Sequence, residues 1–120
     1  MLGTVEQKKF DLLDRTFKFS VNIRNLVREL KVTIITADDI KQVLRSSGSV
    51  GANYIEACEA LSKKDFGHRL KIVRKEAKET VYWLLLIKPF YEEKQTDFNH
   101  LIDEAEQLTK IFGSIVSKIN

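Results

Sequence analysis

Residues 46–57 read SSGSVGANYIEA, and this run of small side chains decides how the chain folds. One interpretation of this run is a loop that splits a helix, because Gly48 and Gly51 would each destabilise a helix by about 0.5–1 kcal/mol relative to alanine. One helical face nevertheless stays in register across the stretch, at Leu44, Ser47, Gly51, Tyr54 and Cys58. A loop would not require that register. We therefore favour a continuous helix whose small residues let another backbone approach closely.

Apolar residues recur at helical spacing on both sides of this stretch. The pattern predicts helices over about residues 8–31, 37–61, 63–88 and 97–119. The 120 residues include one proline and five glycines, and no linker or repeat separates the segments, so we expect a single domain over residues 1–120. Helices joined by short connections pack antiparallel. The expected fold class is all-α, an up-down-up-down antiparallel four-helix bundle.

Local signals predict where three of the helices begin. Thr36 is expected as the N-cap of the second helix, and Ser62 with Asp65 resembles a capping box at the start of the third. Thr96 or Asp97 is expected to cap the fourth. In the first helix the expected apolar stripe comprises Leu13, Phe17, Ser20, Arg24, Val27 and Leu30, widened by Leu12, Phe19, Ile23 and Leu26.

Composition limits the classes of function. Apolar residues make up 43% of the chain and charged residues 31%, which is typical of a folded globular protein. The longest strongly apolar run, residues 81–87, is far below the roughly 20 residues of a membrane span. The N-terminal stretch lacks the pattern of a secretory signal, so we expect an intracellular protein.

The chain offers little material for catalysis. Its one cysteine, Cys58, lies on an apolar helical face, where we expect it to pack as a small hydrophobic residue. His68 and His100 fall on different predicted helices, without the Glu-x-x-His pairs of a metal site in a bundle. We therefore expect no catalytic residues, no metal and no cofactor, and we identify no small-molecule substrate.

Two segments, residues 47–57 and 74–84, resemble signatures of a known family. SGSVGANYIEA resembles a small-residue signature usually written Ser-Ile-Pro-Ala-Asn-Ile-Ala-Glu-Gly, and RKEAKETVYWL is similar to a third-helix signature. The family is that of the four-helix bundle proteins, or 23S rRNA intervening-sequence proteins, which is related to the accessory proteins of diversity-generating retroelements. Gly51 stands where many members carry Pro, and Ala57 where many carry Gly. Both departures favour a continuous helix.

The resemblance implies an all-α bundle that forms a homopentamer in the bacterial cytoplasm. Members are often encoded inside an insertion within the 23S rRNA gene. Nucleic-acid binding is the activity usually suggested for them, and no catalytic residues are assigned.

The third predicted helix carries the candidate nucleic-acid site. Residues 62–88 hold eight basic and three acidic residues, whereas residues 89–120 hold three and six. Steps of four, three, four and three residues form a stripe of Lys64, His68, Lys71, Lys75 and Lys78, with Arg74 beside it. Such a stripe can follow a line of phosphates in RNA or DNA. Alternatively it is a solvated helix face, partly neutralised by neighbouring glutamates or by the acidic fourth helix.

Seven further residues are expected at subunit contacts or close helix packing. Surplus apolar residues at the end of the third helix predict self-association, because soluble monomers rarely expose large apolar patches. The seven residues are Gly48, Gly51, Asn53, Glu76, Glu79, Tyr82 and Trp83. Two hypotheses follow: a ring that binds nucleic acid through phosphates, or a ring-shaped scaffold that docks a protein and has no nucleic-acid role. No membrane partner is expected.

Overall fold

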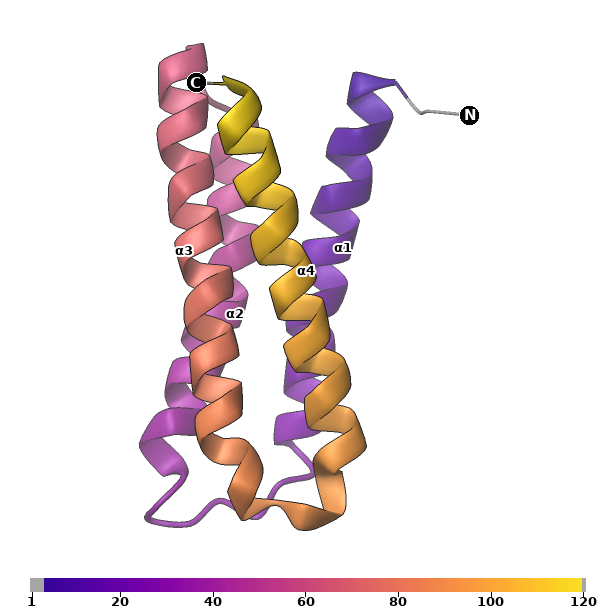
Figure 1. Cartoon of the computed structure of the whole chain (residues 1–120), viewed down its shortest axis with the longest axis vertical. Coiled ribbons are helices and arrows are strands. Elements are labelled where there is room, and N and C mark those ends of the chain that lie inside the picture. The colour runs from indigo at the N-terminus through magenta and orange to yellow at the C-terminus, as the bar shows by residue number, and fades with distance from the viewer. Residues whose placement is uncertain (1–3, 120) are drawn as a thin grey trace.

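Four α-helices alternate in direction along the long axis of the molecule (Figure 1). The computed structural model describes residues 4–119. The helices are α1 (Val5–Val27), α2 (Ala37–Cys58), α3 (Lys63–Ile87) and α4 (Gln95–Ile119), with two short 3-10 turns, η1 (Lys88–Phe90) and η2 (Glu92–Lys94), between α3 and α4. Residues 4–119 contain no strand. The fold is the all-α up-down-up-down bundle that the sequence predicts.

Both ends of α1 and the start of α4 differ from the sequence-based expectation, whereas α4 ends at Ile119 as expected. Thr4 caps α1, since its Oγ1 accepts a hydrogen bond of 3.0 Å from the amide of Gln7. α1 ends at Val27 rather than near residue 31, because the amides of Glu29 and Leu30 bond to carbonyls three residues back and close a turn. The assignment of Thr96 or Asp97 as the α4 cap is wrong, because η2 leads directly into a helix that begins at Gln95.

Thr36 stands at the start of α2, but its side chain does not cap the helix. Its hydroxyl lies 2.8 Å from the Tyr91 hydroxyl, which donates to the carbonyl of Lys31, also at 2.8 Å. This buried chain of hydrogen bonds joins the α1–α2 loop to the α3–α4 connection. Ser62 does cap α3, accepting from the amide of Asp65 at 3.0 Å as expected.

The core lies between the inward faces of all four helices. Phe19, Phe98 and Phe112 are its largest fully buried side chains. The stripe expected in the first helix is partly wrong, because Phe17 is 67% exposed and Arg24 is exposed. Phe19, Ile23 and Leu26, which are expected to widen it, are buried as predicted. The buried face of α1 is rotated by one position, and its members are Thr16, Phe19, Ile23 and Leu26.

α2 is one unbroken helix through its small residues, and these residues lie against α1 and α3. A Cβ atom added at Gly51 would lie 3.4 Å from Thr16 Oγ1 and 3.8 Å from the Thr16 backbone carbon, so α1 passes close to α2 there. On the other side, the buried hydroxyls of Ser46 and Thr80 form a hydrogen bond of 2.8 Å between α2 and α3. Small side chains therefore allow α2 to pack closely on two helices.

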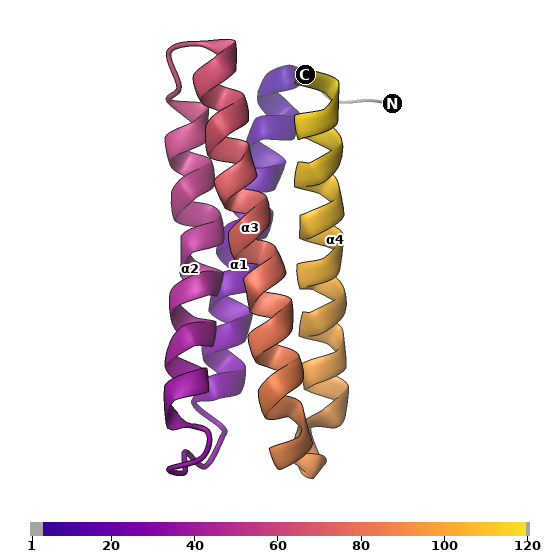
Figure 2. The same cartoon turned by 60° about the vertical axis from the view of Figure 1, so that its left-hand side comes forward.

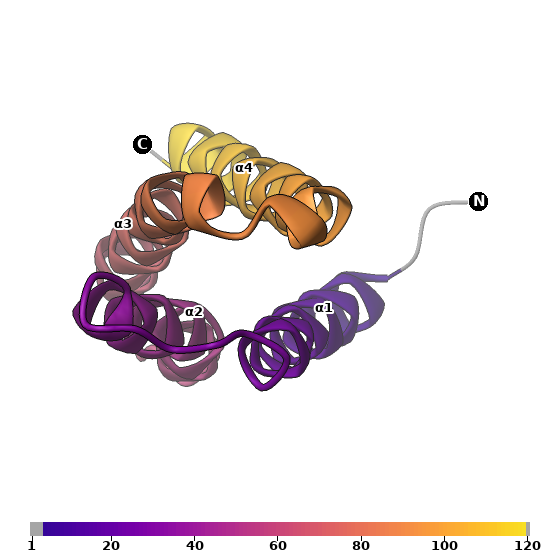
Figure 3. The same ribbon diagram turned by 90° about the horizontal axis from the view of Figure 1, so that it is seen from below.

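α1 and α4 lie farther apart than the other neighbouring helices. Seen from the lower end, the helices follow one another around an arc in chain order, and the arc is least closed between α4 and α1 (Figure 3). α1 packs mainly on α2 and makes far fewer contacts with α4. α3 has α2 on one side and α4 on the other (Figure 2), so only its outer side faces solvent.

The close approach at Gly51 predicts the response to substitution. Gly51→Leu would drive a branched side chain into Thr16 and should lower the free energy of unfolding by about 1–3 kcal/mol. Gly51→Ala adds a Cβ at ordinary contact distance and should not destabilise the protein. Urea melts measure both variants, with Ala52→Leu as the exposed control on the same helix. Equal stabilities of Gly51→Leu and Ala52→Leu would contradict the close packing.

Candidate nucleic-acid interface

The outer side of α3 presents a continuous line of cations. We call Lys64, His68, Lys71, Arg74, Lys75 and Lys78 the basic face of α3. All six side chains are exposed. Within residues 4–119 none of the six has a carboxylate partner within 4.0 Å. The basic face is therefore free of internal ion pairs in the described part of the chain.

Two shallow pockets border the basic face where α3 meets α4. One, of about 330 Å³, is lined by Lys63, Lys64, His68 and Lys71, with Ile119 of α4 closing it. A second, of about 230 Å³, brings Lys110 and Glu106 of α4 beside Lys78. Lys110 thus joins the basic face from another helix. Lys110 is 32 residues after Lys78 in the chain, and no sequence pattern predicts that the two side chains lie close together.

Arg74 leans over α4 between these pockets. A Cβ atom at Gly113 would lie 3.5 Å from Arg74 Nε and 3.6 Å from Arg74 Cδ. The missing side chain at Gly113 makes room for the guanidinium, which extends the basic face toward α4. A larger residue at position 113 would displace it.

The glutamates nearest the basic face in sequence are engaged on the opposite flank of α3. Arg45 of α2 donates to both carboxylate oxygens of Glu76 at 3.2 Å and to Glu79 at 3.0 Å. Glu76 is 7% exposed, so this contact supplies the partner that a buried carboxylate needs. Hydrogen bonding to Glu76, followed by Glu79, raises the pKa of Arg45. Glu76 and Glu79 therefore act in α2–α3 packing, and neither forms an ion pair with a lysine of the basic face in the described residues.

Glu104, the acidic residue of α4 that forms an ion pair in the described part of the chain, faces α1. Arg15 binds the Glu104 carboxylate through two hydrogen bonds of 2.8 Å and the Gln107 side chain through a third of 2.9 Å. The bond to Glu104 raises the pKa of Arg15. Glu106 is the acidic residue of α4 that lines a pocket with a lysine of the basic face. Within residues 4–119 no carboxylate of α4 forms an ion pair with the basic face.

Gly48 and Asn53 lie on the α2 surface near α1. A Cβ atom at Gly48 would lie 3.3 Å from Arg24 Nη2, and Arg24 donates to the carbonyl of Leu44 at 3.2 Å. Asn53 Nδ2 donates to the carbonyl of Ser49 at 2.8 Å, one turn earlier in the same helix. The structure thus places Gly48 in helix packing and gives Asn53 a backbone partner.

An exposed apolar patch continues the line of the basic face toward the end of α3. Tyr82, one step of four beyond Lys78, is 58% exposed, and its ring meets Trp83 edge to face with centroids 5.0 Å apart. Trp83 is partly buried against the core. We call Tyr82, Leu85, Leu86 and Phe90 the apolar patch; all four are exposed.

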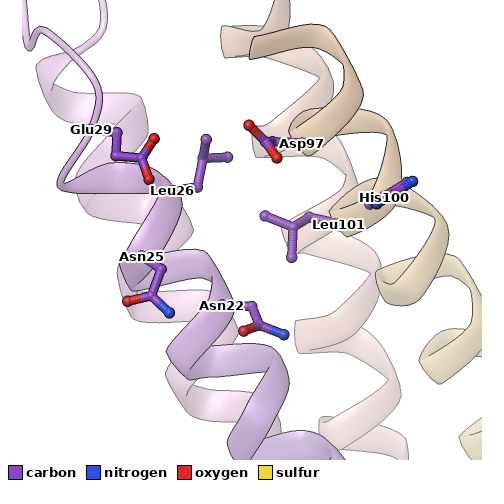
Figure 4. A pocket seen from close by; sticks show the side chains of 7 residues that line it. All are labelled: Asn22, Asn25, Leu26, Glu29, Asp97, His100 and Leu101. Carbon is purple, nitrogen blue, oxygen red and sulfur yellow. The ribbon is translucent and has the colours of Figure 1, made fainter.

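Polar side chains line the seam between α1 and α4. A cavity of about 270 Å³ lies there, lined by Asn22, Asn25 and Leu26 of α1, by Glu29 just beyond its end, and by Asp97, His100 and Leu101 of α4 (Figure 4). Glu29 also forms an ion pair with Lys94. No group of three or more His, Cys, Asp or Glu residues within the described range could hold a metal ion.

Cys58 lies in an environment that suppresses thiolate chemistry. Burial raises the pKa of the thiol, and the nearby positive charge of Lys9 only partly opposes that rise. Burial likewise raises the pKa of Tyr54, one turn earlier. A neutral thiol is a poor nucleophile.

No helix within residues 4–119 is both long and apolar enough to cross a membrane.

Comparison with known proteins agrees with the fold. The family model for the 23S rRNA-intervening sequence protein matches residues 8–114. A crystal structure of a protein of unknown function from the S23 ribosomal protein family of Bacteroides thetaiotaomicron is similar, with 34% sequence identity and a TM-score of 0.79. The alignment covers 92% of this chain and 98% of that one. No curated protein matches the chain.

The Arg45 contact predicts a specific loss of stability. Arg45→Ala would leave Glu76 buried without its partner and should lower the free energy of unfolding by about 1–2 kcal/mol, less than for a fully buried pair because Arg45 is half-exposed. Adding Glu76→Gln should restore part of the loss. Urea melts of both variants, beside Lys41→Ala as an exposed control on α2, provide the measurement. A loss no larger than that of Lys41→Ala would contradict a structural role.

Proposed function

The chain belongs to the 23S rRNA-intervening sequence protein family, and from this premise we propose that it is a non-enzymatic, cytoplasmic, homo-oligomeric bundle that binds RNA or DNA through phosphate contacts. The basic face of α3 is the binding surface. One observation carries the proposal: six basic side chains lie exposed along one side of a helix, with no ion pair to any described residue, while the nearby glutamates are held by Arg45.

The dimensions and chemistry of the basic face suit a nucleic-acid backbone. Fourteen residues separate Lys64 from Lys78, which corresponds to about 21 Å of helix. Phosphates of one strand follow each other along a comparable line, and lysines bind them as point charges without reading the bases. Lys63 and Lys110 border the same surface and add to its positive field.

Self-association is the second part of the proposal. The apolar patch lies at one end of α3, where a single copy of the chain leaves it exposed to water. Burial of Tyr82 and Leu85 against another subunit would remove this exposure, with Trp83 behind them. The family resemblance sets the expected number of subunits at five. A ring would repeat the basic face around its circumference and strengthen the attraction for a polyanion.

Alanine substitutions test phosphate binding. Lys64→Ala, Lys71→Ala, Lys75→Ala and Lys78→Ala should each weaken binding to unrelated RNA and DNA sequences to a similar degree. Each should also reduce the slope of log K against log salt by somewhat less than one unit. Gel-shift titrations at several salt concentrations measure both effects.

A matched pair of double variants controls for net charge. Lys71→Ala with Lys75→Ala removes two charges from the basic face, and Lys31→Ala with Lys41→Ala removes two exposed charges elsewhere. Only the first pair should weaken binding. Equal, weak and salt-insensitive binding by the wild type and by a variant that combines Lys64→Ala, Lys71→Ala, Lys75→Ala and Lys78→Ala would refute the proposal and favour a protein-docking ring.

The assembly is tested by mass. Light scattering should show a species of about 70 kDa, five copies of the 13.9 kDa chain. Tyr82→Glu with Leu85→Glu places two charges in the apolar patch and should dissociate the assembly, whereas Leu61→Glu, at a fully exposed position in the α2–α3 turn, should not. A wild-type species near 13.9 kDa at micromolar concentration would contradict self-association.

A further inference from the structure

Another cavity opens at the end of the bundle where α2 turns into α3. Its volume is about 490 Å³, within the range of small-molecule sites. The first turns of α1, the end of α2 and the start of α3 surround it, and one residue of α4 reaches it. In Figure 1 this is the upper end, where the N-terminal half of α1 stands away from α4.

The inner wall of the cavity is apolar. Tyr54 is almost fully buried at its base, and four side chains that pack on the core present their remaining surface to the opening. These four are Leu12, Cys58, Phe66 and Ile115. Because α1 diverges here, the wall lacks the covering layer that it has lower in the bundle. An apolar body entering the cavity would remove this surface from water.

The inner wall carries few polar groups, and one of them already forms a hydrogen bond within the protein. Ser62 Oγ accepts the capping hydrogen bond from the amide of Asp65 at 3.0 Å. Tyr54 is almost fully buried, so its hydroxyl group presents little surface to a ligand. The wall therefore offers little hydrogen bonding to a sugar or a nucleobase, and it favours a hydrocarbon.

The mouth of the cavity is cationic. Lys8, Lys9 and Lys63 line it, and Glu6 is the acidic residue among the lining side chains. None of the three lysines forms an ion pair with a described residue. Lys9 is half-buried and lines the same cavity as Cys58. Flexible lysine stems can lie along apolar surface while their ammonium groups meet an anion at the rim.

We propose that this cavity binds a fatty carboxylate, a single hydrocarbon chain that ends in one carboxyl group. The hydrocarbon of the ligand lies against Leu12, Phe66 and Ile115. Its carboxylate pairs with the lysines at the mouth, Lys8, Lys9 and Lys63. A cationic amphiphile of the same length would be repelled by the lysines, and a neutral one would lack the ion pair. Charge thus distinguishes the ligand from other apolar molecules. This site includes none of the six residues of the basic face, although Lys63 lines both the cavity and the border of that face.

Calorimetric titration with decanoate, kept below its micelle concentration, tests the proposal. We expect saturable binding of one decanoate per chain, about tenfold tighter than that of decyltrimethylammonium and several-fold tighter than that of 1-decanol. Alkylation of Cys58, the single cysteine, should slow when decanoate is saturating, because the bound hydrocarbon covers the thiol. Absence of saturable decanoate binding, or equal binding of the cationic amphiphile, would overturn the proposal.

Two variants and a matched control localise the site. Lys9→Glu should weaken decanoate binding about three- to tenfold, whereas Lys41→Glu, the same change near the other end of α2, should leave it unchanged. Ala60→Trp places a large ring in the opening and should abolish binding. Thermal melts establish that each variant is folded. Binding that survives both Lys9→Glu and Ala60→Trp at wild-type strength would overturn the assignment to this cavity.

Discussion

The bundle depends on the close approach of α2 to its two neighbours. Gly51 lets α1 pass within contact distance of the α2 backbone, and Ser46 bonds to Thr80 of α3 in the interior. Larger side chains at these positions would separate the helices and open voids in a core that must be filled to high density. The cost of glycine in a helix is about 0.5–1 kcal/mol, and close packing on two sides offsets it. α2 therefore determines where α1 and α3 lie.

The same α2–α3 contact organises the charges. Arg45 reaches across from α2 and holds Glu76 and Glu79 on the inner flank of α3. In the same way, Arg15 of α1 forms an ion pair with Glu104 of α4. Each ion pair joins two helices and gives the carboxylate an arginine partner in place of a lysine of the basic face. The positive field on the outer side of α3 is thus a consequence of how the acidic groups are used in packing.

The fourth contact of the bundle, between α1 and α4, is less complete than the other three. It is bridged by ion pairs and lined by polar residues such as Asn22 and His100. A polar seam holds two helices less tightly than an apolar one, because its side chains remain well solvated. At the upper end α1 diverges, and the apolar wall around Phe66 is left open beneath a rim of lysines. The position of α1 thus has two consequences: the helix packs closely on α2, and it diverges from α4.

The sequence by itself determined the four helices, their alternating directions, the unbroken α2 and the line of basic residues on α3. These features depend on periodicity, on caps such as Ser62 and on composition, all of which act within a few residues of the chain. Only the tertiary structure decided that Phe17 faces outward and Phe19 inward, that Glu76 pairs with Arg45, and that Lys110 lies beside Lys78. Periodicity defines a stripe only to within about one residue, or 100° of rotation. Which side of a stripe is buried, and which charges meet across helices, depends on neighbours that are distant in sequence.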